Sequence, residues 1–256
     1  MAIIILIIFL LIIVGYKLLK NKLYYPGSIG CNHYKKPSKK IKDLWIPFSG
    51  GKLHAWFYYI PKKPIIFICH GNAGNISNRI HLLQDIMKKN MSFFIFDYRG
   101  YGKSNGFTYM NSTADDALIC YKYLINMIGI KEEVIPLGES IGAYSAAKLA
   151  HDEKLKKLIL LCGINSISTV INKFKLLKFL KIFTYGDLDI SKYLKNRKGE
   201  TLILHSKKDE IVCFENAQKN HESAYNATLV EINGNHNNSI FDWSIIGSFI
   251  DNYHLK

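Results

Sequence analysis

The sequence predicts an α/β protein in which a mostly parallel sheet of about eight strands carries helices on both faces. Two observations predict this class. Short apolar runs alternate with longer segments of helical periodicity, and reactive residue types follow several of the runs directly. Two of the runs, IIFIC at 65–69 and SFFIF at 92–96, are apolar without interruption, as expected of strands covered on both faces.

The expected elements follow one another in a regular order. A hairpin is expected at 41–48 and 53–60, because Ser49-Gly50-Gly51 is a turn sequence between two apolar-rich segments. Apolar runs predict six further strands, at 65–69, 92–96, 133–137, 158–162, 201–205 and 227–232. Helical periodicity predicts helices at 77–89, 112–127, 141–151, 213–223 and 240–253, with an irregular helical segment at 164–196.

Residues 1–20 are predicted to form a membrane anchor, and residues 21–40 a lysine-rich linker. Ala2–Val14 contains no polar side chain, and the apolar stretch extends to about the minimum spanning length. A cleaved signal peptide and a buried helix are the alternatives. Lysines follow the run and none precedes it, so the positive-inside bias predicts a single-pass protein with its main domain, 41–256, on the cytoplasmic side.

Composition excludes several classes of protein. With 256 residues, 48% hydrophobic and 21% charged, the chain is neither disordered nor low-complexity. The net charge of +14 comes almost entirely from lysine, and arginine occurs only at Arg79, Arg99 and Arg197. Arginine is the preferred residue for base and phosphate recognition. Nucleic acid is therefore not an expected partner, whereas an anionic membrane surface suits the charge.

No metal or organic cofactor is expected. The five cysteines are widely spaced, without a C-x-x-C pair or a Cys/His ligand pattern, so reduced and mostly buried thiols are the simplest interpretation. Gly102-Lys103-Ser104 resembles the end of a phosphate-binding loop. That pattern needs a glycine five residues earlier, where this chain has Asp97.

A candidate nucleophile lies between an expected strand and an expected helix. Gly138-Glu139-Ser140-Ile141-Gly142 is a G-x-S-x-G motif, in which a tight turn holds the serine at its apex near a helix N-terminus. The glycines two before and two after Ser140 are needed because the turn leaves no room for side chains. Ser140 is therefore the predicted nucleophile.

A serine hydroxyl needs a base to activate it, and the base needs an orienting acid. His236 follows the last expected strand in a loop and is the best candidate for the base, since His221 falls within a helix and His254 is close to the terminus. Asp209 follows the strand 201–205 and is the predicted acid. The nearest alternative for the acid is the adjacent Glu210. Asp187 and Asp189 are poorer alternatives, because they lie in the irregular segment.

Acyl transfer also needs N–H donors for the developing oxyanion. The backbone N–H of Ile141, just after the nucleophile, is one expected donor. The second is expected from Asn72 or Ala73, in the loop 70–75 (HGNAGN) after the strand 65–69, where small residues allow close approach of the backbone. His70 is expected to brace this loop.

Taken together, these segments resemble the α/β-hydrolase superfamily, and most of all its membrane-anchored ABHD-type serine hydrolases. The resemblance rests on HGNAGN (70–75), DYRGYGKSNG (97–106), GESIG (138–142), HSKKDEIV (205–212) and GNHNN (234–238), in the family's order over 41–253. It implies an α/β-hydrolase fold, a cap segment at about 163–197, and a structural role for Asp97 and Arg99 in the turn after the fourth strand.

The sequence thus predicts a serine hydrolase that cleaves carboxylic esters or thioesters through a Ser-His-Asp triad and an acyl-enzyme. The anchor, the basic charge and an apolar cap favour lipid or lipidated substrates. A serine peptidase of the same fold and a catalytically silent membrane-bound scaffold are the alternatives. Within the cap, residues 171–183 (INKFKLLKFLKIF) suit either a helix packed on the sheet or a lid that faces acyl chains or the bilayer.

Overall fold

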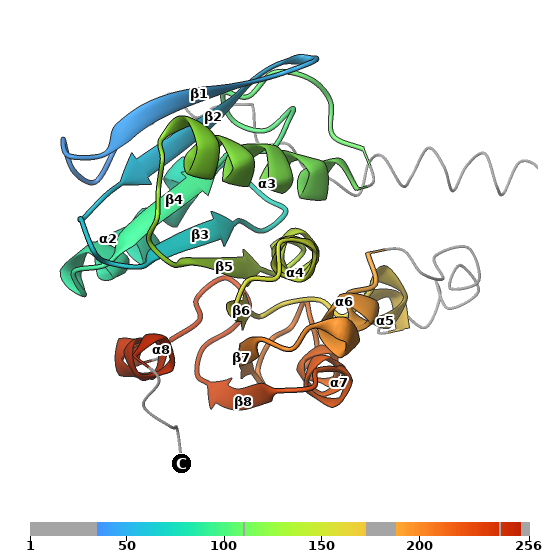
Figure 1. Ribbon diagram of the computed structural model, residues 1–256. Helices are drawn as coiled ribbons and strands as arrows, with labels where there is room; N and C mark the ends of the chain where they lie inside the picture. The colour runs from blue at the N-terminus through green and yellow to red at the C-terminus, as the bar shows by residue number, and fades with distance from the viewer. Residues whose placement is uncertain (1–34, 110, 173–187, 241, 252–256) are drawn as a thin grey trace, which may run out of the picture.

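An eight-stranded sheet forms the centre of the computed structural model, which describes residues 35–109, 111–172, 188–240 and 242–251 (Figure 1). The strands are β1 (Lys42–Phe48), β2 (Gly51–Tyr58), β3 (Ile65–Cys69), β4 (Ser92–Phe96), β5 (Val134–Glu139), β6 (Lys157–Leu161), β7 (Glu200–Ser206) and β8 (Ala227–Ile232). Their order across the sheet is β1-β2-β4-β3-β5-β6-β7-β8. The first two junctions, β1–β2 and β2–β4, are antiparallel and all the others are parallel.

The described helices cover both faces of the sheet. They are η1 (Ile76–Arg79), α2 (Ile80–Lys88), α3 (Ser112–Lys122), η2 (Tyr123–Met127), α4 (Gly142–Asp152), α5 (Ile167–Asn172), α6 (Ser191–Asn196), α7 (Glu215–Ser223) and α8 (Trp243–Ile250). Helices α2 and α8 lie on one face, and α3, α4, α6 and α7 on the other (Figure 1).

Two apolar cores result, one on each face. Because side chains alternate along a strand, Phe67 and Phe94 pack toward α3 and α4, whereas Ile66 and Ile68 pack toward α2 and α8. All five residues of β3 and all five of β4 are buried, which explains why these strands lack a polar face.

The expected fold class and strand count are confirmed, with differences at element boundaries. Gly138 and Glu139 continue β5 because their backbones pair with Leu160 and Leu161 of β6, so the first two of the five residues of the G-x-S-x-G motif are strand. The last helix begins later than expected, at Trp243, because Ile240 pairs with Asn233 in a short antiparallel bridge. The expected helix 112–127 is α-helical only to Lys122 and then widens into a π-turn.

Several predictions fall on residues that the structure does not describe. The anchor at 1–20 and most of the linker at 21–40 lie outside the described ranges, as do residues 173–187 of the cap. Of the cap, α5 and α6 are described and flank that gap. Among the helices that the structure describes, none combines the length and apolarity needed to cross a bilayer.

Candidate active site

Ser140 lies at a strained turn between β5 and α4. Its φ of 54° places it in the left-handed region, which non-glycine residues seldom adopt. A side chain would not fit on either side of it: a Cβ at Gly138 would lie 2.5 Å from Ala143 Cα, and one at Gly142 would lie 2.1 Å from the Cys69 carbonyl oxygen. The two glycines of the motif are thus required by close backbone packing, as the sequence predicts.

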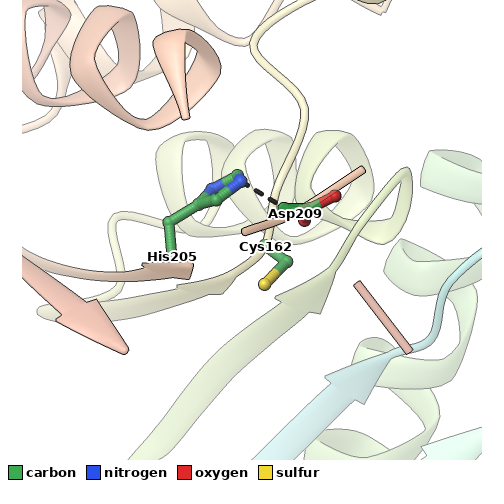
Figure 2. Close-up of side chains that lie close together, drawn as sticks. All are labelled: Cys162, His205 and Asp209. Atoms are coloured by element: carbon green, nitrogen blue, oxygen red, sulfur yellow. Dashed lines mark ion pairs between the residues drawn. The ribbon is translucent and has the colours of Figure 1, made fainter. Parts of the chain in front are cut away.

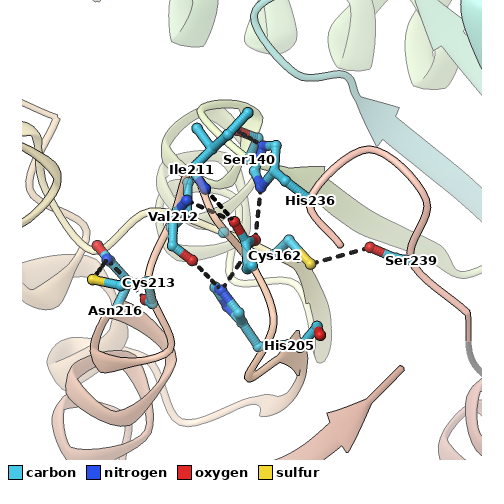
Figure 3. Close-up of polar contacts among 12 residues, drawn as sticks. Ser140, Cys162, His205, Ile211, Val212, Cys213, Asn216, His236 and Ser239 are labelled. Carbon is cyan, nitrogen blue, oxygen red and sulfur yellow. Dashed lines mark hydrogen bonds and ion pairs between the residues drawn. The ribbon is translucent and has the colours of Figure 1, made fainter. Parts of the chain in front are cut away.

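The three side chains of the predicted triad form a continuous hydrogen-bonded chain (Figure 3). His236 Nε2 lies 3.0 Å from Ser140 Oγ, and His236 Nδ1 lies 2.7 Å from Asp209 Oδ2. Because the carboxylate accepts the proton on Nδ1, Nε2 is left with its lone pair toward the serine hydroxyl. This arrangement can withdraw the hydroxyl proton from Ser140.

Asp209 is held as a carboxylate by its hydrogen bonds. Its Oδ1 accepts the backbone N–H groups of Ile211 and Val212, at 2.9 and 2.7 Å. Burial by itself would raise the pKa of Asp209, but hydrogen bonds from His205, His236 and the Val212 amide outweigh burial and hold that pKa well below its usual value. These hydrogen bonds therefore favour the ionised form of the acid.

Among the residues that the structure describes, the alternative acids Glu210 and Asp189 and the alternative base His221 do not take part in the triad. The carboxylate of Glu210 accepts the backbone N–H of His236 at 3.2 Å, and so helps to hold the loop rather than the ring. Asp189 accepts the N–H of Ser191 at the start of α6, and His221 lies on α7. Asp187 and His254 lie outside the described residues.

The loop after β3 carries the predicted oxyanion donors to the side of Ser140. Asn72, Ala73 and Ile141 line the same cavity as Ser140. The Gly71 N–H is directed elsewhere, to Glu139 Oε2 at 3.2 Å, and the Asn72 side chain accepts the Tyr101 hydroxyl at 2.8 Å. Within the described part of the chain, no hydrogen bond takes the N–H of Ile141 or Ala73. The backbone N–H groups near Ser140 thus suit the predicted oxyanion hole.

His70 is hydrogen-bonded to this loop, as expected of a bracing residue. Its Nδ1–H donates to the Gly71 carbonyl at 2.7 Å, and the peptide N–H that follows, on Asn72, must point the opposite way. Burial is the main reason that the pKa of His70 is lowered to about 4. His70 Nε2 is buried without a hydrogen-bond partner among the described residues.

An ion pair that the sequence does not reveal connects the oxyanion loop to the nucleophile turn. Arg79 Nε donates to Glu139 Oε2 at 2.9 Å, and Arg79 Nη1 donates to the Ala73 carbonyl at 2.7 Å. Burial would raise the pKa of Glu139, but Arg79 and the Gly71 N–H lower it overall. In the sequence, the only sign of this ion pair was a charged residue, Glu139, at the variable position before Ser140. The sequence did not indicate that Arg79 would be its partner.

His205 is a second residue that sequence reasoning missed. It ends the same strand that Asp209 follows, and its Nε2–H donates to the Val212 carbonyl at 2.8 Å. The same nitrogen lies 3.4 Å from Asp209 Oδ2. His205 therefore closes the loop that presents the acid.

Cys162, His205 and Asp209 form a close cluster whose ligand atoms lie within 4.8 Å of one another (Figure 2). Thiolate, imidazole and carboxylate are groups that bind zinc. Here each group already has a protein partner: Asp209 bonds His236, His205 bonds Val212, and Cys162 Sγ lies 3.2 Å from Ser239 Oγ. Burial raises the pKa of Cys162 to about 11, so it is a thiol rather than a thiolate at neutral pH. We therefore interpret the cluster as one that holds Asp209 in position.

A cavity of about 300 Å³ opens beside Ser140. Its polar lining comes from the oxyanion loop and from Arg79, Glu139, His236 and Asn237. The aliphatic lining comes from the nucleophile turn, the cap and the loop after Asp209, namely Ile141, Ile164, Ile167, Val170, Leu188, Ile211 and Val212. The reactive serine therefore opens onto a cavity with both polar and aliphatic walls.

Known proteins are similar in sequence to part of this chain. Residues 60–188 match the Hydrolase_4 family, described as serine aminopeptidase, S33. The α/β-hydrolase domain-containing protein WAV2 of Arabidopsis thaliana is 31% identical over 153 residues, which cover 57% of this chain and 49% of WAV2. Protein bem46 of Schizosaccharomyces pombe is 30% identical over 165 residues, which cover 59% of this chain and 52% of bem46. The chain thus spans about half the length of these relatives.

The fold has counterparts among solved structures. The Pyrococcus furiosus esterase Pf2001 superposes with a TM-score of 0.69 over 83% of this chain and 90% of its own, at 19% sequence identity. At that identity the likeness concerns the fold, which is the α/β-hydrolase fold. Since the family model matches half of the chain, this protein belongs to the Hydrolase_4 (S33) family of the α/β-hydrolase superfamily.

Proposed function

We propose that this protein is a serine hydrolase that cleaves carboxylic esters or thioesters with Ser140 as nucleophile, His236 as general base and Asp209 as orienting acid. The observation that carries the proposal is the continuous chain from Ser140 Oγ through His236 to Asp209, with contacts of 3.0 and 2.7 Å. The two outer residues are 69 positions apart along the chain (209 − 140), so sequence proximity does not account for their meeting.

In the acylation step, His236 Nε2 takes the proton of Ser140 while Oγ bonds to the substrate carbonyl carbon. The carbonyl oxygen becomes an oxyanion, which the N–H groups of Ile141 and of Asn72 or Ala73 stabilise. The imidazolium then donates its proton to the leaving alcohol or thiol as the bond from the carbonyl carbon breaks. The product is an ester of Ser140.

In the deacylation step, water takes the place of the leaving group. His236 removes a proton from the water, whose oxygen bonds to the acyl carbon, and then returns a proton to Ser140 Oγ as the acid is released. Asp209 stays ionised throughout and stabilises the imidazolium that forms twice in each cycle. No cofactor enters this sequence.

The aliphatic cavity supports an apolar acyl group. The carbonyl carbon must lie within bonding distance of Ser140 Oγ, and Ser140 lines this cavity. Side chains such as Ile167 and Val170 of α5 would then contact the acyl chain, which gains from leaving water at about 25 cal/mol per Å² of apolar surface. Esters or thioesters of aliphatic acids are the proposed substrates.

A fluorophosphonate probe tests the proposal directly. The probe should attach covalently to the wild-type protein at Ser140, and the label should be absent from the Ser140→Ala variant. Hydrolysis of p-nitrophenyl esters of graded chain length should disappear in the same variant. A folded protein that neither reacts with the probe nor hydrolyses any ester would contradict the proposal and favour a non-catalytic scaffold.

Amide cleavage is the second candidate, because the family's description names an aminopeptidase. An aminopeptidase needs an anionic group near the nucleophile to bind the substrate's free amino group. Glu139 lines the cavity, but its carboxylate is paired with Arg79 and with the Gly71 N–H. Parallel assays on a matched aminoacyl ester and aminoacyl p-nitroanilide decide between the two, and we expect turnover of the ester to dominate.

We also propose that the protein is membrane-tethered through residues 1–20, with the hydrolase domain on the cytoplasmic side. The support comes from the apolar stretch Ala2–Val14 and the lysines that follow it. Cell fractionation of the full chain and of a form that lacks residues 1–20 tests the tether. Loss of membrane association in the shortened form alone is the expected result.

A further inference from the structure

A buried asparagine, Asn165, connects the two ends of the cap. It follows β6, precedes α5 and is 6% exposed. Residues 163–172 form the entry stem of the cap and residues 188–196 form its exit stem, on either side of the part that the structure does not describe (Figure 1). Because Asn165 lies in the entry stem, its bonds to the exit stem decide how the two stems are placed.

Asn165 binds the exit stem through both its backbone and its side chain. Its carbonyl accepts the N–H of Ile190 at 3.0 Å, and its Nδ2 donates to Ser191 Oγ at 3.0 Å. Within the entry stem, Asn165 Oδ1 accepts the hydroxyl of Thr169 at 3.3 Å. The two stems are therefore joined at this one residue.

Two asparagines of α7 bind the same residue. Asn216 Oδ1 accepts the backbone N–H of Asn165 at 2.9 Å, and Asn220 Oδ1 accepts Asn165 Nδ2 at 3.0 Å. Asn220 Nδ2 also donates to the carbonyls of Gly163 and Ile164, at 3.5 and 3.4 Å. Asn216 and Asn220 are completely buried, although asparagine is mostly an exposed residue. Asn165, Asn216 and Asn220 together form an asparagine network.

Buried amides fix a position more strictly than aliphatic side chains do. Two aliphatic surfaces can shift against each other with little loss of contact, whereas a shifted amide leaves a buried donor or acceptor without a partner. Asn216 and Asn220 are four positions apart and so lie on one face of α7. The network therefore sets the position of both stems along α7. Its members are neutral, so this effect does not depend on pH.

The stems held by the network carry much of the aliphatic wall beside Ser140. Ile167 and Val170 belong to the entry stem and Leu188 to the exit stem, and all three line the cavity. Ile164 lines it too, but its N–H also donates to the Ser140 carbonyl at 3.2 Å, which holds it independently of α7. No residue of α7, which the structure describes in full, lines the cavity.

We propose that the asparagine network determines the acyl-chain selectivity of the enzyme, because α7 fixes the shape of the cavity through Asn216 and Asn220. Both are positioning residues, since they act through the stems. The inference rests on the proposed function, in which an apolar acyl group occupies this cavity. Loss of the network should weaken contact with the acyl chain and leave bond formation at Ser140 unchanged.

Asn220→Leu tests the proposal on two esters, p-nitrophenyl octanoate and p-nitrophenyl acetate. The variant keeps the approximate size of the side chain and removes its amide. We expect kcat/KM for the octanoate to decrease by about 4- to 15-fold, as the loss of one or two methylene contacts would produce, and kcat/KM for the acetate to stay within about 2-fold of wild type. The rate of fluorophosphonate labelling and the pH profile for the acetate should not change.

Three further variants serve as comparisons. Ser191→Ala removes one hydroxyl from the exit stem and should lower the octanoate-to-acetate ratio of kcat/KM by a smaller factor, and it decides the test if Asn220→Leu does not fold. The Ser191→Ala/Asn220→Leu double variant should lower the ratio by less than the product of the two single effects, because both act through Asn165. Gln218→Leu makes the same change from amide to aliphatic side chain at an exposed position of α7 and should leave the ratio unchanged.

The outcomes separate this inference from the proposed function. A wild-type octanoate-to-acetate ratio in folded Asn220→Leu, or in Ser191→Ala where Asn220→Leu does not fold, overturns the inference while the hydrolase proposal stands. Equal loss of both esters in a folded variant also overturns it, because the network then acts on the triad rather than on the acyl chain. A Gln218→Leu variant with the same decrease as Asn220→Leu does so as well. Absence of fluorophosphonate labelling at Ser140 in the wild-type protein overturns the hydrolase proposal itself.

Discussion

The guanidinium of Arg79 joins the two halves of the candidate oxyanion hole. It donates to Glu139, the residue immediately before Ser140, at 2.9 Å, and to the carbonyl of Ala73 in the opposing loop at 2.7 Å. Glu139 in turn accepts the Gly71 N–H of that loop. The Arg79–Glu139 ion pair and the hydrogen bonds of its two side chains to Ala73 and Gly71 thus link the turn that carries the Ile141 amide to the loop that carries the amides of Asn72 and Ala73.

Arg79→Lys should lower kcat with little change in KM. A lysine keeps the charge but cannot reach Glu139 and Ala73 at once, so the loop loses one of its two attachments. We expect a decrease in kcat of about 10- to 100-fold, which is less than the 10²- to 10³-fold cost of removing an oxyanion donor outright. Steady-state kinetics on one p-nitrophenyl ester measure it. Glu139→Gln is the control: it keeps an acceptor for Gly71 and should fall between wild type and Arg79→Lys.

Asp209→Asn should lower kcat by about 10⁴-fold without unfolding the protein, as loss of the acid does in triads of this kind. The asparagine oxygen can still accept the Ile211 and Val212 amides, so the loop keeps its form. Its NH₂ group cannot accept the proton on His236 Nδ1, and the imidazole is no longer held in the reactive tautomer. Single-turnover kinetics together with far-UV circular dichroism test this, and a variant with near wild-type turnover would refute the role of Asp209.

Acid should destabilise the protein through His70. Its pKa in the folded state is about 4, against 6.5 for an unperturbed histidine. Between these values the unfolded chain binds a proton that the folded chain does not, so stability falls as pH decreases from about 6.5 to about 4, by on the order of 3 kcal/mol. Urea denaturation at pH 7, 5.5 and 4.5 measures the effect.

His70→Asn supplies the comparison for that pH series. Asparagine can donate to the Gly71 carbonyl but does not titrate, so the variant should lose less stability than wild type over the same range. Parallel pH profiles for the two proteins would show that His70 is not the group responsible.

Gly142→Ala should prevent folding or abolish activity. The added Cβ would lie 2.1 Å from the Cys69 carbonyl oxygen and 2.6 Å from that of His70, both backbone atoms that cannot move without displacing β3. The expected result is loss of soluble protein, or soluble protein without fluorophosphonate labelling. By contrast, nothing lies within 4 Å of a Cβ at Gly247 in α8, so Gly247→Ala should leave expression and labelling intact.

The alternation of apolar runs and helical periodicity was sufficient to predict the class of fold and all eight strands, because both patterns are local properties of the chain. Gly138, Ser140 and Gly142 identified the nucleophile turn for the same reason: the geometry of a tight turn restricts the residues that form it. Position after an expected strand then pointed to Asp209 as the acid and to His236 as the base, in preference to His221 within an expected helix. The structure brings the selected pair to Ser140.

Tertiary structure alone decided what surrounds those residues. Arg79 meets Glu139 only because β3 and β5 are neighbours, so that the loop after one strand lies against the turn after the other. His205 likewise lies close enough to Asp209 to support it. Val170 lines one cavity and Asn238 lines another, because segments that are distant in the chain converge at one edge of the sheet. Local patterns carry no information on such pairings, since the free energy that selects them comes from burial and hydrogen bonding between segments far apart in the chain.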